Sequence, residues 1–245
     1  LVLSVFWMIY TVYRPSVDPG LACEISLLVE QITTTGQDVE SMLLVLEPYF
    51  LQPSVLFWAA AVVGGVMPIL EEVLKPIALW PLAGKEITPQ EGFIGGLLCG
   101  AGFAVTENLL YFSLAVSQEE WLLMVIGRAG TGILHMLASG LVGWGMVKTW
   151  RSGKWGAQVV LSLGAFFLHS LWNVLALFVG IAPEYLIEPG PTLGQMVLFY
   201  IPIIVLLILS IAGIYLINRR FRNQNNNGFE SQNEELQEEI KAVIS

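Results

Sequence analysis

The sequence is poor in charge and in cysteine. Only 13% of its 245 residues are charged, whereas 55% are apolar, far from the balance of an ordinary soluble domain. Its 11 lysines and arginines form no basic patch of the kind that nucleic acid requires, so nucleic-acid binding is excluded. Two cysteines, Cys23 and Cys99, do not make a disulfide framework. The zinc-protease pattern HExxH is also absent. What remains is the composition of a membrane protein.

Long apolar runs dominate the chain. Five of them can cross a hydrocarbon core, which takes about 20 helical residues. They are Ser54–Leu82, Gly92–Val116, Trp121–Val147, Gly156–Ile181 and Met196–Ile217. Because the chain begins at Leu1 rather than at Met, we interpret residues 1–13 as the remnant of a further span. We therefore expect an all-α fold, a polytopic transmembrane helix bundle with five complete spans and a truncated N-terminal one.

Local signals mark helix starts and helix contacts. Thr88-Pro89-Gln90-Glu91 is a capping box with proline at the first helical position, and residues 117–120 form a second box. Glycines recur at helical spacing in two spans, where small residues let helices approach closely in lipid. They are Gly92, Gly96 and Gly100 in one span, and Gly127, Gly130 and Gly132 in the next.

Basic residues in the short loops predict the orientation. One loop holds Lys148, Arg151 and Lys154, and three arginines, Arg219, Arg220 and Arg222, follow the last span. The intervening loop, Ala182–Gln195, has two glutamates and no basic residue. The C-terminus is therefore predicted to be cytoplasmic.

This topology divides the chain into four parts. Residues 1–13 are the truncated span, and residues 14–53 an acidic exocytoplasmic loop with an amphipathic helix around Val39–Leu46. Residues 54–217 form the five-span membrane domain, in which we expect the functional site, and residues 218–245 a cytoplasmic polar tail. Within that tail we expect Asn223–Asn227 to be a linker to a short helix, Glu234–Ile244.

Ionisable side chains inside the spans are the candidate functional residues, because each costs roughly 2.5–3.5 kcal/mol on insertion scales. Both histidines of the protein are among them. Counted from the cytoplasmic ends of their spans, four helices bring polar groups to one depth, as a common site requires. The candidates are Glu71, Glu72 and Lys75; Glu107 and Asn108; Arg128 and His135; and His169 and Asn173.

Simpler interpretations exist for several of these residues. Lys75 lies three and four residues after two glutamates, so it can serve only to neutralise them within the helix. One lysine cannot neutralise both, however. Glu107 and Asn108 can be polar contacts between helices, and a lone buried histidine is more often a hydrogen-bonding group than a catalyst. Arg128 lies near a span end, where an arginine can extend to the interface.

The residue types suit hydrolysis. A carboxylate in a low-dielectric cavity can act as a general base on water. Imidazole and carboxamide groups can stabilise the oxyanion that forms when water attacks a peptide carbonyl. A set of glutamate and histidine can also hold zinc with three protein ligands and one water.

Four motifs, in order on four spans, resemble those of the PrsW family of intramembrane proteases. They are Glu71-Glu72-Val-Leu-Lys75, Gly102-Phe103-Ala-Val-Thr-Glu107-Asn108, Gly127-Arg128 with His135, and His169-Ser-Leu-Trp-Asn173. The resemblance covers about residues 54–180. Through it the chain is also similar to type II CAAX prenyl endopeptidases, although Glu107 stands where those enzymes have histidine.

The resemblance implies roles and partners. Glu71 would activate water, and His169 with Asn173 would polarise the carbonyl and hold the oxyanion. It implies a membrane-protein substrate, typically an anti-sigma factor, and a bacterial plasma membrane. We expect glutamate chemistry without a cofactor. The alternative is a zinc enzyme, with Glu107, His135 and His169 as ligands. A proton-coupled transporter, a non-catalytic scaffold and a prenyl-protein processing enzyme are further alternatives.

Overall fold

The structure is a computed structural model that describes residues 53–112, 118–186 and 192–244, together with Gly20, Cys23, Ser26, Leu27 and Glu30. The predicted truncated span and, apart from these positions and Pro53, the predicted acidic loop lie outside the described residues. The chain divides into two units, residues 1–68 and 69–245. All candidate site residues belong to the second unit.

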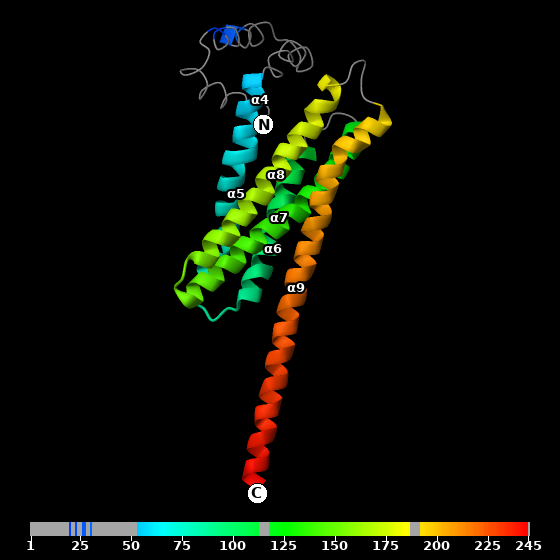
Figure 1. The fold of residues 1–245 in the computed structure, drawn as a ribbon. Coiled ribbons are helices and arrows are strands. Elements are labelled where there is room, and N and C mark those ends of the chain that lie inside the picture. The colour runs from blue at the N-terminus through cyan, green and yellow to red at the C-terminus, as the bar shows by residue number, and fades with distance from the viewer. Residues whose placement is uncertain are drawn as a thin grey trace. The chain divides into compact units, whose positions relative to one another are not determined.

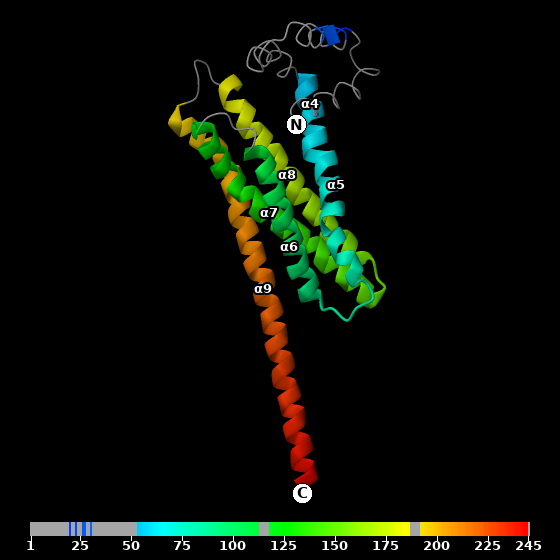
Figure 2. The ribbon, with the colours of Figure 1, turned by 180° about the vertical axis from the view of Figure 1, so that it is seen from behind.

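The described part of the chain is helical and contains no strand. Five of its segments are long and apolar enough to cross a membrane, which confirms the predicted helix bundle. They are Leu56–Leu82, Pro89–Phe112, Arg128–Ser152, Gly156–Val179 and Val197–Gly228. The four longest helices are α6 (Pro89–Phe112), α7 (Gln118–Ser152), α8 (Gly156–Leu186) and α9 (Leu193–Ile244). Helix α7 lies between α6 and α8 and also contacts α9 (Figures 1 and 2). Its span, Arg128–Ser152, is the most buried of the five.

The first span changes helix type three times. Helix α4 (Pro53–Ala61) leads into a π-helical segment, η1 (Val62–Val66), and then into α5 (Met67–Leu74). After Leu74 the chain tightens into a 3₁₀ helix, η2 (Lys75–Leu82). Pro76 accounts for this last change, because it lacks an N–H for the α-helical bond and disfavours α geometry in the preceding residue. Lys75, which precedes Pro76, therefore begins the 3₁₀ helix one turn after the two glutamates.

Helix α6 begins at the predicted capping box. The Thr88 N–H donates to Glu91 Oε2 at 2.7 Å, and the Glu91 N–H donates to Thr88 Oγ1 at 3.2 Å. Ser117 of the second predicted box lies outside the described residues. A further box starts α9, where the Thr192 N–H donates to Gln195 Oε1 at 2.9 Å and the Gln195 N–H to Thr192 Oγ1 at 3.4 Å. Its pattern, Thr-x-x-Gln, is visible in the sequence.

The glycines of α6 bring its backbone directly onto α7. A methyl group built on Gly96 would overlap the carbonyl oxygen of Ser139, and one on Gly100 would overlap that of His135. A methyl on Gly92 would lie 2.7 Å from the Gly143 carbonyl oxygen. The predicted close approach is confirmed, and it occurs along the face of α7 that carries His135.

Helix α9 is continuous where we expected a linker. It runs without a break through Asn223–Asn227 to Ile244. Once a long apolar helix is nucleated, each added residue contributes a hydrogen bond, so a short asparagine run need not end it. The Asn225 Nδ2 group also donates to Gln90 Oε1 at 2.8 Å, and Phe221 packs against Phe93 and Trp144. At about 1.5 Å per residue, its 52 residues exceed the roughly 30 Å hydrocarbon core, so one end must project beyond a bilayer.

Candidate functional site

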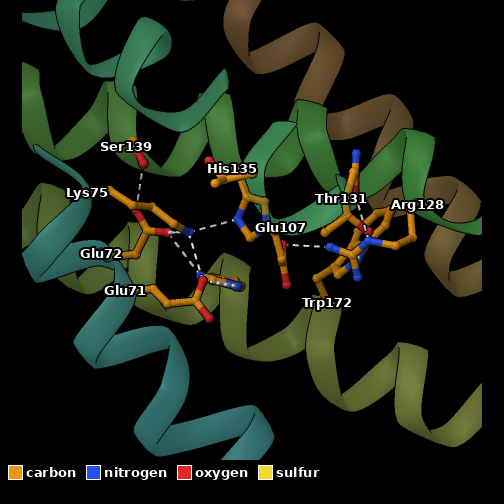
Figure 3. A network of polar contacts seen from close by, with 12 residues as sticks. Glu71, Glu72, Lys75, Glu107, Arg128, Thr131, His135, Ser139 and Trp172 are labelled. Carbon is orange, nitrogen blue, oxygen red and sulfur yellow. Dashed lines mark hydrogen bonds and ion pairs between the residues drawn. The ribbon is translucent and has the colours of Figure 1, made fainter. Parts of the chain in front are cut away.

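Four helical segments contribute polar side chains to one network (Figure 3). The contributing segments are α5 with the start of η2, followed by α6, α7 and α8. The network joins most of the candidates predicted from the sequence. Its members are Glu71, Glu72, Lys75, Glu107, Asn108, Arg128, His135 and His169.

Glu72 is fully enclosed and fully hydrogen-bonded. Its side chain has 0% exposure. Oε1 accepts from Lys75 Nζ at 2.7 Å and lies 2.9 Å from His169 Nδ1. Oε2 accepts from Ser139 Oγ at 3.1 Å. With its oxygens engaged in this way, Glu72 is suited to hold its neighbours in place.

Glu71 differs from its neighbour. Its side chain retains 14% exposure, and its Oε2 atom is buried without a hydrogen-bond donor among the described residues. That oxygen lies 3.0 Å from Lys75 Nζ, an ion pair without hydrogen-bond geometry, and 3.6 Å from His169 Nε2. A buried carboxylate oxygen without a donor is costly, so it is a natural position for a water molecule or a cation.

Lys75 bridges the carboxylates to the first histidine. Its ammonium lies 2.8 Å from His135 Nδ1 and 4.1 Å from the centre of the Phe103 ring. The expectation that Lys75 only neutralises the two glutamates is therefore incomplete. His135 and His169 are each 1% exposed, and their rings meet edge to face at 4.7 Å.

A second carboxylate lies behind His135. Glu107 Oε2 is 3.0 Å from His135 Nε2 and 2.6 Å from Arg128 Nη2. The Arg128 Nε–H donates to Asn108 Oδ1 at 2.7 Å, and the guanidinium stacks on the Tyr111 ring at 4.0 Å. Arg128 is thus directed towards Glu107 and Asn108 of α6, and the simpler interpretation, that it extends to the membrane interface, does not hold. The acceptor oxygens of Glu107 and Asn108 account for the difference.

Some placements were not anticipated. Ser139, Phe103 and Tyr111 contact the network but were not predicted as site residues. Ser139 had a detectable signal, because it follows His135 by four residues and so shares its face of α7. Asn173 is half-buried on α8, four residues after His169. It shares the His169 face of that helix, as the spacing predicts.

The network contains donors suited to a metal ion. One ligand atom each of Glu71, His135 and His169 lie within 4.8 Å of one another. Two histidines, one glutamate and a water form a known type of catalytic zinc site. Each histidine has its other nitrogen beside a carboxylate, as metal-bound histidines usually do. The residues therefore fit zinc, with Glu71 in the position that we expected Glu107 to take.

Lys75 complicates this fit. Its ammonium is within 3.0 Å of both Glu71 Oε2 and His135 Nδ1, so it already places a positive charge among the three donors. A metal ion would have to displace the lysine side chain. The arrangement therefore offers one position for which a tethered cation and a metal ion compete.

Three comparisons with known proteins were informative to different degrees. Neither the curated proteins nor the solved structures include a match to the chain. A family model described as PrsW family intramembrane metalloprotease matches residues 25–207, well over half of the 245 residues. That range includes every side chain of the network. The chain is therefore an integral membrane protein that belongs to the PrsW family of intramembrane proteases.

Proposed function

We propose that this protein is an endopeptidase in which Glu71 activates a water molecule to cleave a peptide bond of a membrane-protein substrate. The observation that carries the proposal is the contrast between the two adjacent glutamates. Glu72 has both oxygens hydrogen-bonded, whereas the buried Glu71 Oε2 accepts no hydrogen bond from a described residue and lies 3.0 Å from Lys75 Nζ and 3.6 Å from His169 Nε2. A general base needs such a free acceptor in reach of its water.

The proposed reaction uses only side chains of the network. Glu71 takes a proton from water, the water oxygen bonds to the peptide carbonyl carbon, and the C–N bond breaks. The same proton then returns from Glu71 to the leaving nitrogen. Glu72, 2.9 Å from His169 Nδ1, holds this imidazole with Nε2 towards the water. The Lys75 ammonium and the Asn173 carboxamide stabilise the oxyanion in this scheme.

Zinc is the alternative partner for the same residues. Glu71, His135 and His169 would hold it, and a bound zinc ion would polarise the substrate carbonyl and make its bound water more acidic. We propose the metal-free reaction because the Lys75 ammonium lies within 3.0 Å of two of these donors. In both chemistries Glu72 and Glu107 orient the two imidazoles.

We further propose that the substrate is a membrane protein of a bacterial plasma membrane, and that the C-terminus of the chain faces the cytoplasm. An anti-sigma factor with one transmembrane segment is a substrate of this type. The orientation is supported by basic residues at one end of the second unit. Phe221 packs on Trp144 and Asn225 bonds Gln90, so the arginines after the last span lie at the same end of this unit as the Lys148–Lys154 loop.

A reconstituted cleavage assay tests the function. Purified protein is incorporated into liposomes with a single-span substrate, and its fragments are measured over time. We expect cleavage by the wild-type protein and a loss of about 100-fold or more in His169→Gln. Lys154→Gln, in the exposed α7–α8 loop, is the control and should retain the wild-type rate. If folded wild-type protein cleaves no single-span substrate offered, a transporter or a scaffold becomes the better account.

Treatment with a zinc chelator distinguishes the metal-free reaction from the zinc-dependent one. The metal-free reaction predicts that the rate survives prolonged treatment with a zinc chelator. A loss of activity that returns on addition of zinc would instead assign Glu71, His135 and His169 as ligands.

A further inference from the structure

Arg128 lies outside the centre of the proposed site but is connected to it through two contacts. Its guanidinium is 2.6 Å from Glu107 Oε2, and the same oxygen is 3.0 Å from His135 Nε2. Figure 3 shows the three side chains in a row, with Arg128 on the far side of Glu107 from Lys75. The Arg128 side chain is 16% exposed, so the ion pair is largely shielded from solvent.

The hydrogen-bond partners of His135 permit only one tautomer of the neutral ring. A lysine ammonium only donates hydrogen bonds, so the 2.8 Å contact with Lys75 requires Nδ1 to be the acceptor. The single N–H of the neutral ring is then on Nε2, where it donates to Glu107 Oε2. In the opposite tautomer, two donors would meet at Nδ1 and two acceptors at Nε2.

The carboxylate must itself be held for this arrangement to persist. Glu107 is 20% exposed and lies on one face of α6, where its flexible side chain has other rotamers. Arg128 limits that freedom, because its fork engages Glu107 and Asn108 together, and its plane stacks on Tyr111. Glu107, Asn108 and Tyr111 lie within one turn of α6, so the guanidinium is held against that turn.

We propose that Arg128 is a positioning residue that acts through Glu107 to hold His135 in the tautomer with its N–H on Nε2, so that the Nδ1 lone pair faces Lys75 and Glu71. The proposal rests on the proposed function in one respect, since it treats His135 as part of the reacting site. It changes the expected role of Glu107, which acts behind the imidazole. The same tautomer serves a water or a metal ion at Nδ1.

The two histidines of the protein make the test direct. Protein labelled with ¹³C,¹⁵N-histidine and ¹⁵N-methionine gives two ring systems, and only His135 is followed by methionine, so its signals can be assigned. In the wild-type protein we expect the ¹⁵N shift of an unprotonated nitrogen at Nδ1 and of a protonated one at Nε2. An Nδ1-protonated His135 in the wild type overturns the proposal without any variant.

Arg128→Gln tests the role of the guanidinium. We expect its His135 signals to change towards a mixture of tautomers, and kcat to fall by about 10- to 100-fold with little change in KM. Arg151→Gln, an exposed arginine on the same helix, is the matched control and should keep the wild-type spectrum. If Arg128 only ties α6 to α7, the variant will lose thermal stability while the tautomer stays unchanged, and the proposal is then rejected.

The spectrum and the cleavage assay test the positioning role and the proposed function independently. If the tautomer depends on Arg128 but no substrate is cleaved, only the proposed function is overturned. If cleavage proceeds through Glu71 and the tautomer is independent of Arg128, only the positioning role is overturned.

Discussion

At the scale of single residues, two adjacent glutamates have different environments. Successive residues of an α-helix point about 100° apart, so Glu71 and Glu72 meet Lys75 and His169 at different distances. Glu72 is hydrogen-bonded to Ser139, Lys75 and His169, whereas Glu71 Oε2 lies near the same lysine and histidine without a hydrogen bond from a described residue. In the proposed reaction the pair therefore divides into a base, Glu71, and a positioning group, Glu72.

Glu72→Gln should mainly reduce stability. The amide removes a charge that is buried between Lys75 and His169, and breaking a buried ion pair by changing one partner costs about 3–5 kcal/mol. Thermal unfolding in detergent should show a larger loss for Glu72→Gln than for Glu71→Gln, which is paired less closely. Equal melting temperatures for the two variants would contradict the division of roles.

Lys75→Met should lower the thermal stability of the metal-free protein but raise its affinity for a metal ion. Without metal, it leaves buried carboxylates without their counter-ion and should lower the melting temperature. With zinc or cobalt, it removes the competing cation, so affinity should rise by at least about tenfold, which corresponds to about 1.4 kcal/mol. Cobalt absorption and calorimetric titration measure this affinity directly. Unchanged or weaker binding would show that Lys75 does not occupy the metal position.

At the scale of elements, the contact between α6 and α7 sets the geometry of the site. Gly96 and Gly100 lie against the carbonyl groups of Ser139 and His135, and these backbone atoms cannot move as a side chain can. The spacing between the two helices therefore fixes where His135 lies relative to Glu107.

Gly96→Ala tests this contact. The added methyl would overlap the Ser139 carbonyl, so we expect a loss of about 1–3 kcal/mol in the free energy of unfolding, as for overpacked cores. Gly102→Ala on the same helix is the matched control, because nothing lies within 4 Å of its added methyl. The control should be neutral or slightly stabilising, since alanine favours helix. Similar unfolding free energies for the two variants would contradict the close approach.

The elements also show what can be predicted from sequence. Capping at Thr88 and close packing at the glycines were predictable, because they depend on spacing within a few residues. The continuity of α9 was not, because the preceding helix and the Asn225–Gln90 contact override the low helix propensity of asparagine. The inward direction of Arg128 depends on Glu107 and Asn108, which are 21 and 20 positions away in sequence.

At the scale of the whole molecule, hydropathy predicted five spans, and the cost of buried charge predicted most members of the site. The expectation that these groups meet at one level came from counting residues along the helices. The pairing of carboxylates with imidazoles within the site did not follow from the sequence. Which carboxylate meets which imidazole depends on helix rotation, so Glu71 rather than Glu107 joins the two histidines as a candidate ligand.

The orientation in the membrane stays a prediction that labelling can test. In a variant without Cys23 and Cys99, single cysteines are introduced and treated with an impermeant reagent from outside. We expect labelling within 14–53 and 182–195, and none in the Lys148–Lys154 loop or after Arg219. Labelling of that basic loop from outside would reverse the topology.

The central claim is that Glu71 is the base, and the rate of peptide cleavage by Glu71→Gln tests it most directly. The amide keeps the shape of the side chain but cannot accept the proton. Glu86→Gln, in an exposed loop, is the control for the same substitution. The measurement is the single-turnover rate constant in liposomes, with folded protein matched by its melting temperature. We expect the rate constant of Glu71→Gln to be at least about 100-fold below that of the wild type, and the rate constant of Glu86→Gln to equal it. A near wild-type rate in folded Glu71→Gln would contradict the account.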